Sequence, residues 1–179
     1  MEPPLSETTP EAPPCLQGGG DMGALMRHHP WQETPVGPPA GWPASLRTLV
    51  AAVLQCQLPM YVAWGEHFTQ FYNDAYRPIL GDKHPAALGR PSFETWSEIW
   101  PTIGPMWQDV LNGQPVGFDD FKLTIDRYGY PEDCYFNFSY SPVQDDSGHN
   151  NGVMVTFAET TQRVLNERRL NFLDALSQD

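Results

Sequence analysis

The segment QFYNDAYRPILGDKHPAALGRP, from Gln70 to Pro91, is the part of this sequence that most restricts the possible folds. It begins within a short apolar strand, Phe68 to Tyr72, and a helical turn opens at Asn73 or Asp74. Gly81 stops this turn, and a second small helix follows His84. A strand that runs at once into short helical pieces predicts one compact unit of mixed secondary structure.

Strands are also predicted on both sides of this segment. Gly65 and Glu66 form a tight turn that makes a hairpin of the first two strands, and a longer helix runs from Trp100 to Asn112. The turn-rich stretches DRYGYPED and QDDSGHNN separate the last three strands. Antiparallel strands with helices gathered on one face indicate an α+β fold. The five predicted strands are Met60 to Trp64, His67 to Tyr72, Gly117 to Asp126, Asp133 to Val143 and Gly152 to Ala158.

The order of these elements resembles that of PAS sensor domains. The second segment that carries the resemblance is SPVQDDSGHNNGVMVTFAETTQRVLNERR, in which an acidic residue and a threonine, Glu159 and Thr161, follow the last strand. The resemblance covers roughly Leu58 to Arg169 and is strongest to the modules at the front of soluble bacterial sensor histidine kinases. It implies a PAS fold: a five-stranded antiparallel sheet in the order 2-1-5-4-3, with short helices and one longer helix on one face and a flanking helix at each end.

Length and composition predict one domain with tails. A chain of 179 residues with 40% hydrophobic residues can bury one sizeable core. Residues 1–20 are rich in Pro, Glu, Thr and Gly, so we expect a disordered lead there. Residues 21–57 should form N-terminal flanking helices, the first of them capped by Asp21. Residues 58–160 should form the PAS core, and residues 161–179 a C-terminal linker or signalling helix.

Both flanking regions carry an apolar helical face. In the first region this face either covers the sheet of its own domain or contacts a partner subunit. In the C-terminal helix it either packs on its own domain or forms a short dimer seam. We therefore expect a homodimer through one of these helices or both. The residues of the two faces are Leu46, Leu49, Val50, Val53 and Leu54 in the first, and Leu165, Arg169, Phe172, Leu173 and Leu176 in the second.

The candidate ligand site is a set of aromatic residues. Three tryptophans recur at helical spacing, and strand alternation places three aromatic residues of one strand and two residues of the last strand on shared faces. PAS domains hold ligands between the inner sheet face and the helices, so the resemblance implies that this set lines a pocket. The alternative is that these side chains only fill the core. The candidates are Trp96, Trp100, Trp107, Phe136, Phe138, Tyr140, Val155 and Phe157.

Two cofactors known in the family are disfavoured by the residues. The stretch PSFETWSEIW lacks the cysteine that the light-driven flavin adduct requires. No histidine occurs between Pro85 and Gly148, where the haem branch places its axial ligand. Noncovalent FAD, held by tryptophan stacking, stays as an option, and no cofactor is assigned.

The net charge of −12 and the pI near 4.6 disfavour nucleic acid and anionic membrane surfaces as partners. No apolar run approaches the roughly 18 residues of a membrane span, and the N-terminus does not resemble a signal peptide. Three cysteines without metal-ligand spacing fit a reducing compartment, so we expect a cytoplasmic protein.

The resulting hypothesis is a sensory PAS input module of a bacterial signal-transduction protein. It would bind a small molecule and pass a change through the C-terminal helix to a downstream domain, such as a histidine kinase. The first alternative is a ligand-free PAS module that serves dimerisation. The second is a small cone-like α+β enzyme, but the sequence contains none of the common catalytic motifs that would support this alternative. Its carboxylates, expected in turns and at strand edges, are Asp119, Asp120, Asp126, Glu132 and Asp133.

Overall fold

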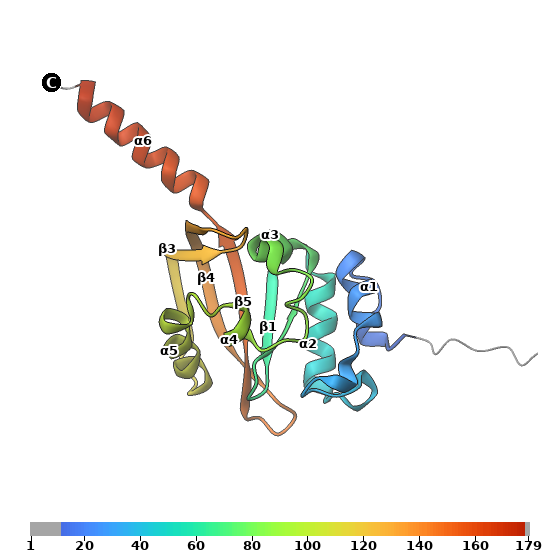
Figure 1. Ribbon diagram of the computed structural model, residues 1–179. Coiled ribbons are helices and arrows are strands. Elements are labelled where there is room, and N and C mark those ends of the chain that lie inside the picture. Colours follow the sequence, from blue (N-terminus) through green and yellow to red (C-terminus); the bar gives the residue numbers. More distant parts are fainter. Residues whose placement is uncertain (1–11, 178–179) are drawn as a thin grey trace, which may run out of the picture.

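A computed structural model describes residues 12–177 of the chain (Figure 1). One antiparallel sheet has the strand order β2-β1-β5-β4-β3, which confirms the predicted five-stranded sheet and its order. A hairpin joins β1 to β2, and β5 lies in the middle of the sheet between β1 and β4. The strands are β1 (Met60–Trp64), β2 (Thr69–Tyr72), β3 (Val116–Asp126), β4 (Pro131–Gln144) and β5 (Asn150–Glu159).

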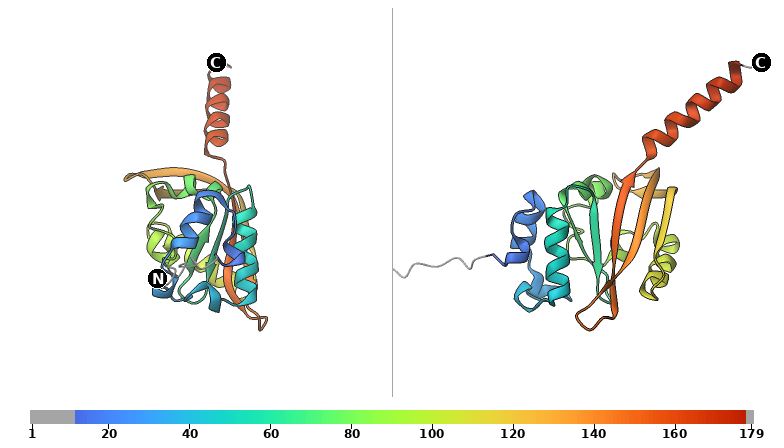
Figure 2. Two further views of the ribbon diagram at one scale, coloured as in Figure 1. Left: turned by 90° about the vertical axis from the view of Figure 1, so that its right-hand side faces the viewer. Right: turned by 180° about the vertical axis from the view of Figure 1, so that it is seen from behind.

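Short helices follow β2, and the one long helix of the core follows them, as the sequence predicted. The small helix predicted after His84 is wrong, because residues 84–89 form turns. Three of these helices cover one face of the sheet, here called the inner face (Figures 1 and 2). Two helices precede the sheet and one follows it, and no helix within residues 12–177 has the length and apolarity to cross a bilayer. The α-helices are α1 (Gly20–His28), α2 (Ala44–Gln55), α3 (Arg77–Leu80), α4 (Ser92–Thr95), α5 (Trp100–Leu111) and α6 (Thr161–Ser177).

The register of the strands decides which side chains face the helices. Tyr61 and Tyr140 both lie opposite Val155, and Phe138 lies opposite Phe157. Directly opposed residues share a face of an antiparallel sheet. Tyr61, Phe138, Tyr140 and Phe157 therefore share the inner face, as strand alternation predicted for β4 and β5.

The N-terminal helices cover the outer face of β1 and β2. The indole of Trp31 stacks on Phe71 of β2 at a centroid distance of 4.9 Å and an interplanar angle of 17°, and Trp42 meets the same ring edge-on at 5.4 Å. Val50 and Val53 of α2 are completely buried. The apolar face of α2 is thus used within its own domain, and the alternative expectation, a dimer contact through this face, is wrong.

The predicted disordered lead is wrong for its described part, residues 12–20. Residues Pro14–Leu16 form a short 3-10 helix that packs against α2, and Leu16 is 1% exposed. Gly19 has a φ of +76°, and a Cβ there would lie 2.7 Å from the side chain of Leu54. A composition argument counts apolar residues and misses the contacts made here: Leu16 is buried, glycines allow close approach to α2, and Arg27 donates to the carbonyls of Leu16 and Gly18 at 2.7 and 3.0 Å. Residues 1–11 lie outside the described part of the chain.

Carboxylates of the core cap both N-terminal helices. Asp74 accepts hydrogen bonds from the backbone amides of Asp21 and Met22 at the start of α1, both at 3.0 Å. Asp146 does the same for Ala44 and Ser45 at the start of α2, at 3.1 and 2.8 Å. Asp21 was predicted to cap its own helix but lies inside it, because tertiary contacts supply the acceptor that a local N-cap would otherwise provide.

Helix α6 leaves the domain and projects away from it (Figures 1 and 2). Its first turns are anchored: Arg163 pairs with Asp120 of β3, and Val164 is buried. The guanidinium of Arg168 lies 4.9 Å from the ring centre of Tyr135. Every described residue of α6 from Leu165 onward is exposed, so the rest of the helix has no cover from its own domain.

Candidate functional site

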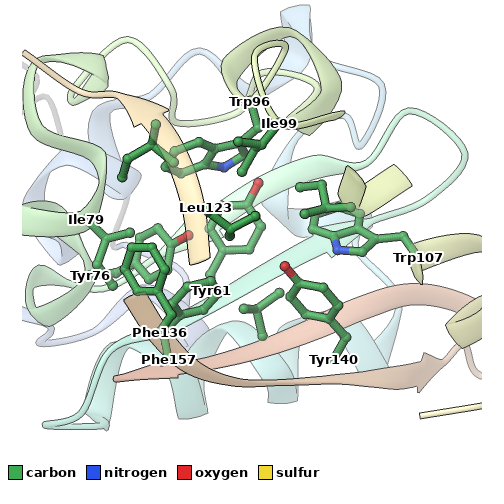
Figure 3. A pocket seen from close by; sticks show the side chains of 13 residues that line it. Tyr61, Tyr76, Ile79, Trp96, Ile99, Trp107, Leu123, Phe136, Tyr140 and Phe157 are labelled. Atoms are coloured by element: carbon green, nitrogen blue, oxygen red, sulfur yellow. The ribbon is translucent and has the colours of Figure 1, made fainter. Parts of the chain in front are cut away.

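The inner face of the sheet and the core helices enclose a small cavity (Figure 3). Its volume is about 20 Å³, counted as the space open to the centre of a water molecule. Roughly 10–15 Å³ on this measure holds one water, so the cavity has room for about one water molecule. The lining residues are Tyr61, Tyr76, Ile79, Trp96, Ile99, Ile103, Trp107, Leu123, Ile125, Phe136, Tyr140, Val155 and Phe157.

Most of the residues predicted for the pocket come together in this lining. They are Trp96, Trp107, Phe136, Tyr140, Val155 and Phe157. The other two lie beside it. Trp100 packs edge-on against Trp107 at a centroid distance of 5.2 Å, and Phe138 packs against Phe121 of the edge strand β3.

Other lining residues were not predicted, and all of them come from outside β4 and β5. Tyr61 is on β1, Ile79 on α3, and Leu123 and Ile125 on β3. The alternation along β3 was a usable signal, because Leu123 and Ile125 share a parity and are both buried. No local signal marks Tyr76, which reaches the cavity because the chain turns back after β2.

The hydroxyl of Tyr61 belongs to a buried polar network. It donates to Oε1 of Gln70 at 2.6 Å and lies 2.5 Å from Oγ of Ser92. The amide of Gln70 also contacts Thr95, and Ser92 donates to the carbonyl of Phe68 at 2.8 Å. Burial raises the pKa of Tyr61, so this hydroxyl stays neutral. The network ties β1 and β2 to α4 on one side of the cavity.

Trp107 offers a different kind of polar group. Its Nε1 is buried and makes no hydrogen bond within residues 12–177, although the hydroxyl of Tyr140 points toward this side chain in Figure 3. Burial raises the pKa of Tyr140, and the nearby indole of Trp107 opposes part of that rise. An unpaired buried donor costs about 1–3 kcal/mol. An acceptor atom placed in the cavity would relieve that cost.

The cavity does not fit a flavin or a haem in this conformation. Sites for small molecules and cofactors have volumes of about 300–1,000 Å³, far above the space present here. No histidine lines the cavity, and Nδ1 of His84 is 2.8 Å from the hydroxyl of Tyr72. Among residues 12–177 no three His, Cys, Asp or Glu side chains form a group that could hold a metal ion.

The carboxylates of the enzyme alternative are not in the cavity, whose lining contains no Asp or Glu. Asp120 pairs with Arg163, Asp133 with Lys122, and Glu132 with Arg127. The side chain of Asp126 accepts a hydrogen bond from the amide of Gly129 within the β3–β4 turn. The remaining member of the set, Asp119, is exposed. These groups serve local structure and the surface.

Comparison with known proteins agrees with this architecture. The sequence profile of the family described as the PAS fold matches residues 62–165, which is more than half of the chain. A search of curated proteins gives no significant match.

Solved structures with similar folds share little sequence with the chain. An RNA-binding light-oxygen-voltage receptor superimposes with a TM-score of 0.51 at 19% identity, covering 81% of this chain and 42% of that receptor. The phage VqmA–DPO complex gives a TM-score of 0.51 at 18% identity, with 72% and 59% covered. The PAS domain from Bordetella pertussis BvgS gives 0.45 at 20%, with 73% and 97% covered. The chain thus spans less than half of the receptor's length.

Proposed function

This chain belongs to the PAS fold family, whose members are generally sensory signalling modules, and from that membership we propose that it is the sensory input module of a bacterial signal-transduction protein. In this proposal, occupancy of the interior cavity changes the position and the pairing of α6. A downstream domain, such as a histidine kinase, reads that change.

One observation carries the proposal: the central strand of the cavity continues almost directly into the exposed helix. Val155 and Phe157 of β5 line the cavity, β5 ends at Glu159, and α6 begins at Thr161. Only Thr160 separates the two elements. A shift of β5 by a ligand would therefore move the base of α6, and a ligand changes such an equilibrium only by binding the two states differently.

The lining of the cavity indicates an uncharged ligand. It consists of aliphatic residues, tyrosines, tryptophans and phenylalanines, with no ionic side chain to pair with a buried charge. The space of about 20 Å³ means that anything larger than about one water must displace side chains. The flavin option has no support from this volume.

The small cavity also favours a second candidate, a ligand-free module that serves dimerisation. Its support is that the aromatic side chains nearly fill the interior, as in a packed core. An enzymatic function has no such support, because the cavity lining offers no carboxylate, histidine or cysteine.

For both candidates we propose a homodimer through α6. Leu165, Phe172 and Leu176 repeat at the spacing of a coiled-coil seam and are 48%, 64% and 59% exposed. An isolated helix of this length is only marginally stable in water, so a second copy would stabilise it. Arg169 lies in the middle of the seam, and in a parallel pair the two Arg169 side chains would approach each other. The dimer should therefore be weak.

We also propose a cytoplasmic location. The free thiols of Cys15, Cys56 and Cys134 are compatible with a reducing compartment.

Native mass spectrometry of the purified protein, combined with amide hydrogen exchange, tests the sensor proposal. We expect a small bound molecule without absorption above 350 nm, and its removal should change exchange in residues 161–167 of α6. A protein that carries no molecule, and whose α6 exchange does not respond to a metabolite extract, would leave only the dimerisation function. A coloured protein with the mass of a bound flavin would contradict the proposed ligand class.

A further inference from the structure

Two polar groups meet on one wall of the cavity, the indole of Trp107 from α5 and the hydroxyl of Tyr140 from β4. The two side chains are 2% and 1% exposed. Their rings meet edge-on at a centroid distance of 5.8 Å and an interplanar angle of 78°, and the hydroxyl points toward the indole (Figure 3). Within residues 12–177 the indole N–H has no hydrogen-bonded partner. It is therefore a buried donor that an atom in the cavity could satisfy.

Tyr140 can supply a second donor to the same atom. Burial raises the pKa of its hydroxyl, so this group keeps its proton at neutral pH. An indole N–H can only donate, whereas a phenol can donate or accept. A carbonyl oxygen has two lone pairs, so it can accept from both groups at once. The pair thus suits an oxygen acceptor.

The hydroxyl of Tyr61 does not have the same freedom, although this residue also lines the cavity. It donates to Oε1 of Gln70 at 2.6 Å and lies 2.5 Å from Oγ of Ser92. Its proton is used within the protein. Tyr61 consequently fixes the wall, and the donors for a ligand are those of Trp107 and Tyr140.

A charged ligand does not fit this lining. It contains no Arg, Lys or His to pair with a carboxylate and no Asp or Glu to pair with an ammonium. Aromatic rings alone can bind a cation, but Nζ of Lys83 already lies 5.5 Å from the ring centre of Trp96. A second cation near this ring would be repelled by the first. The acceptor should therefore belong to a neutral molecule.

We infer that Trp107 and Tyr140 recognise the carbonyl oxygen of a small neutral ketone or amide. The oxygen takes the space of about 20 Å³, which holds about one water molecule. The apolar part of the ligand displaces side chains of the opposite wall, which includes Ile79 of α3. This inference rests on the proposed sensory function and names the ligand class of its site.

Cyclopentanone and methylenecyclopentane are matched probes, because one carries an oxygen where the other carries a methylene group. Ile79→Ala makes room for both without changing either donor, and Leu123→Ala replaces it if that variant does not fold. The measured quantity is the ratio of the two dissociation constants, since the difference in hydration between the probes cancels when variants are compared.

Adding Trp107→Phe to the enlarged variant should weaken ketone binding about tenfold relative to alkene binding, equal to about 1.4 kcal/mol. Tyr140→Phe should change the ratio in the same direction. Trp100→Phe is the matched control, because Trp100 packs against Trp107 but is not part of the lining, and it should leave the ratio unchanged. In NMR spectra of protein isotope-labelled at its tryptophans, the ketone should shift the indole N–H signal of Trp107 more than the alkene does.

An unchanged ratio in the Trp107→Phe variant would overturn the inference, as would an indole signal that responds equally to both probes. Tighter binding of tetramethylammonium than of cyclopentanone would overturn it in favour of a cation site. Failure of both probes to bind either enlarged variant would also contradict it. These outcomes concern the ligand class alone, because the response of α6 to a native ligand is measured by hydrogen exchange without these probes. A site that binds the alkene and the ketone regardless of Trp107 would leave the sensory function with an apolar ligand.

Discussion

Oδ1 of Asp74 accepts the backbone N–H of Met22 at 3.0 Å, so a residue in the loop after β2 caps a helix that begins more than fifty positions earlier in the chain. Asp74 is in the segment that also places Tyr76 in the cavity wall. Helix α1 is thereby hydrogen-bonded to the segment that contributes Tyr76 to the cavity wall, so it forms part of the folded domain.

Asp74→Ala should destabilise the protein by about 1–2 kcal/mol, the usual cost of a lost helix cap. The loss should be concentrated in α1, which depends on this carboxylate for two amide partners. Urea unfolding gives the total change and hydrogen exchange in residues 20–28 gives its location. Asp82→Ala removes a nearby exposed carboxylate that makes no side-chain hydrogen bond to the described residues, so it should change stability by less than about 0.5 kcal/mol. Equal effects of the two substitutions would contradict the capping role.

Trp107→Ala should cost about 3–5 kcal/mol, because it removes a large buried side chain from the cavity wall. The space it leaves should accept indole, and added indole should raise the melting temperature of this variant more than that of the parent protein. Trp107→Phe is the control, since it keeps most of the volume and removes the unpaired Nε1. A variant that indole does not stabilise would show that the core collapses into the space.

Phe172→Asp should weaken self-association while leaving the free energy of unfolding of the domain nearly unchanged, because Phe172 is 64% exposed on α6. Sedimentation equilibrium reports the association and urea unfolding the stability. Val53→Asp should instead unfold the domain, since Val53 is fully buried between α2 and the sheet. A parent protein that stays monomeric at high concentration would refute the proposed dimer.

Arg169→Leu should tighten the same dimer by about tenfold or more, equal to at least about 1.4 kcal/mol. The reason is that the substitution completes the apolar seam of Leu165, Phe172 and Leu176 and removes two facing charges. Arg168→Leu is the control, because Arg168 lies over Tyr135 of its own domain. An unchanged dissociation constant for Arg169→Leu would place the interface on another surface.

Stability should fall as the pH is lowered from about 7 to about 5. Burial and the nearby Arg77 lower the pKa of His84, so the unfolded chain takes up a proton at a pH where the folded protein keeps this imidazole neutral. Folding is therefore opposed once the pH drops below the ordinary value of about 6.5. Burial also lowers the pKa of His29, which reduces stability at low pH in the same way. Urea midpoints at three pH values should show a smaller slope for His84→Asn, and an equal slope would exclude His84 as a source.

The pattern of the sequence was sufficient to predict the sheet and much of the cavity lining. Alternation along β4 and β5 placed Phe136, Tyr140, Val155 and Phe157 on one face, because side-chain direction in a strand is a local property. Helical spacing also predicted that Trp96 and Trp107 lie together, but Trp96 lies in the turn between α4 and α5, so tertiary packing places both rings in the lining. Trp100 and Phe138 satisfy the same local rules and still lie beside the cavity, because the packing of α5 and the sheet edge decides which way a ring can turn.

Only the tertiary structure decided which groups meet across long separations. The apolar stripe of α2 was visible in the sequence, but whether it covers a sheet or a second subunit depended on Trp31 and Trp42 reaching Phe71. The volume of the cavity and the contacts of Arg127 with Glu159 and Pro78 depend on how separate elements pack. Local sequence sets the periodicity and direction of side chains, whereas the spaces and ion pairs between elements arise from close packing of the whole chain.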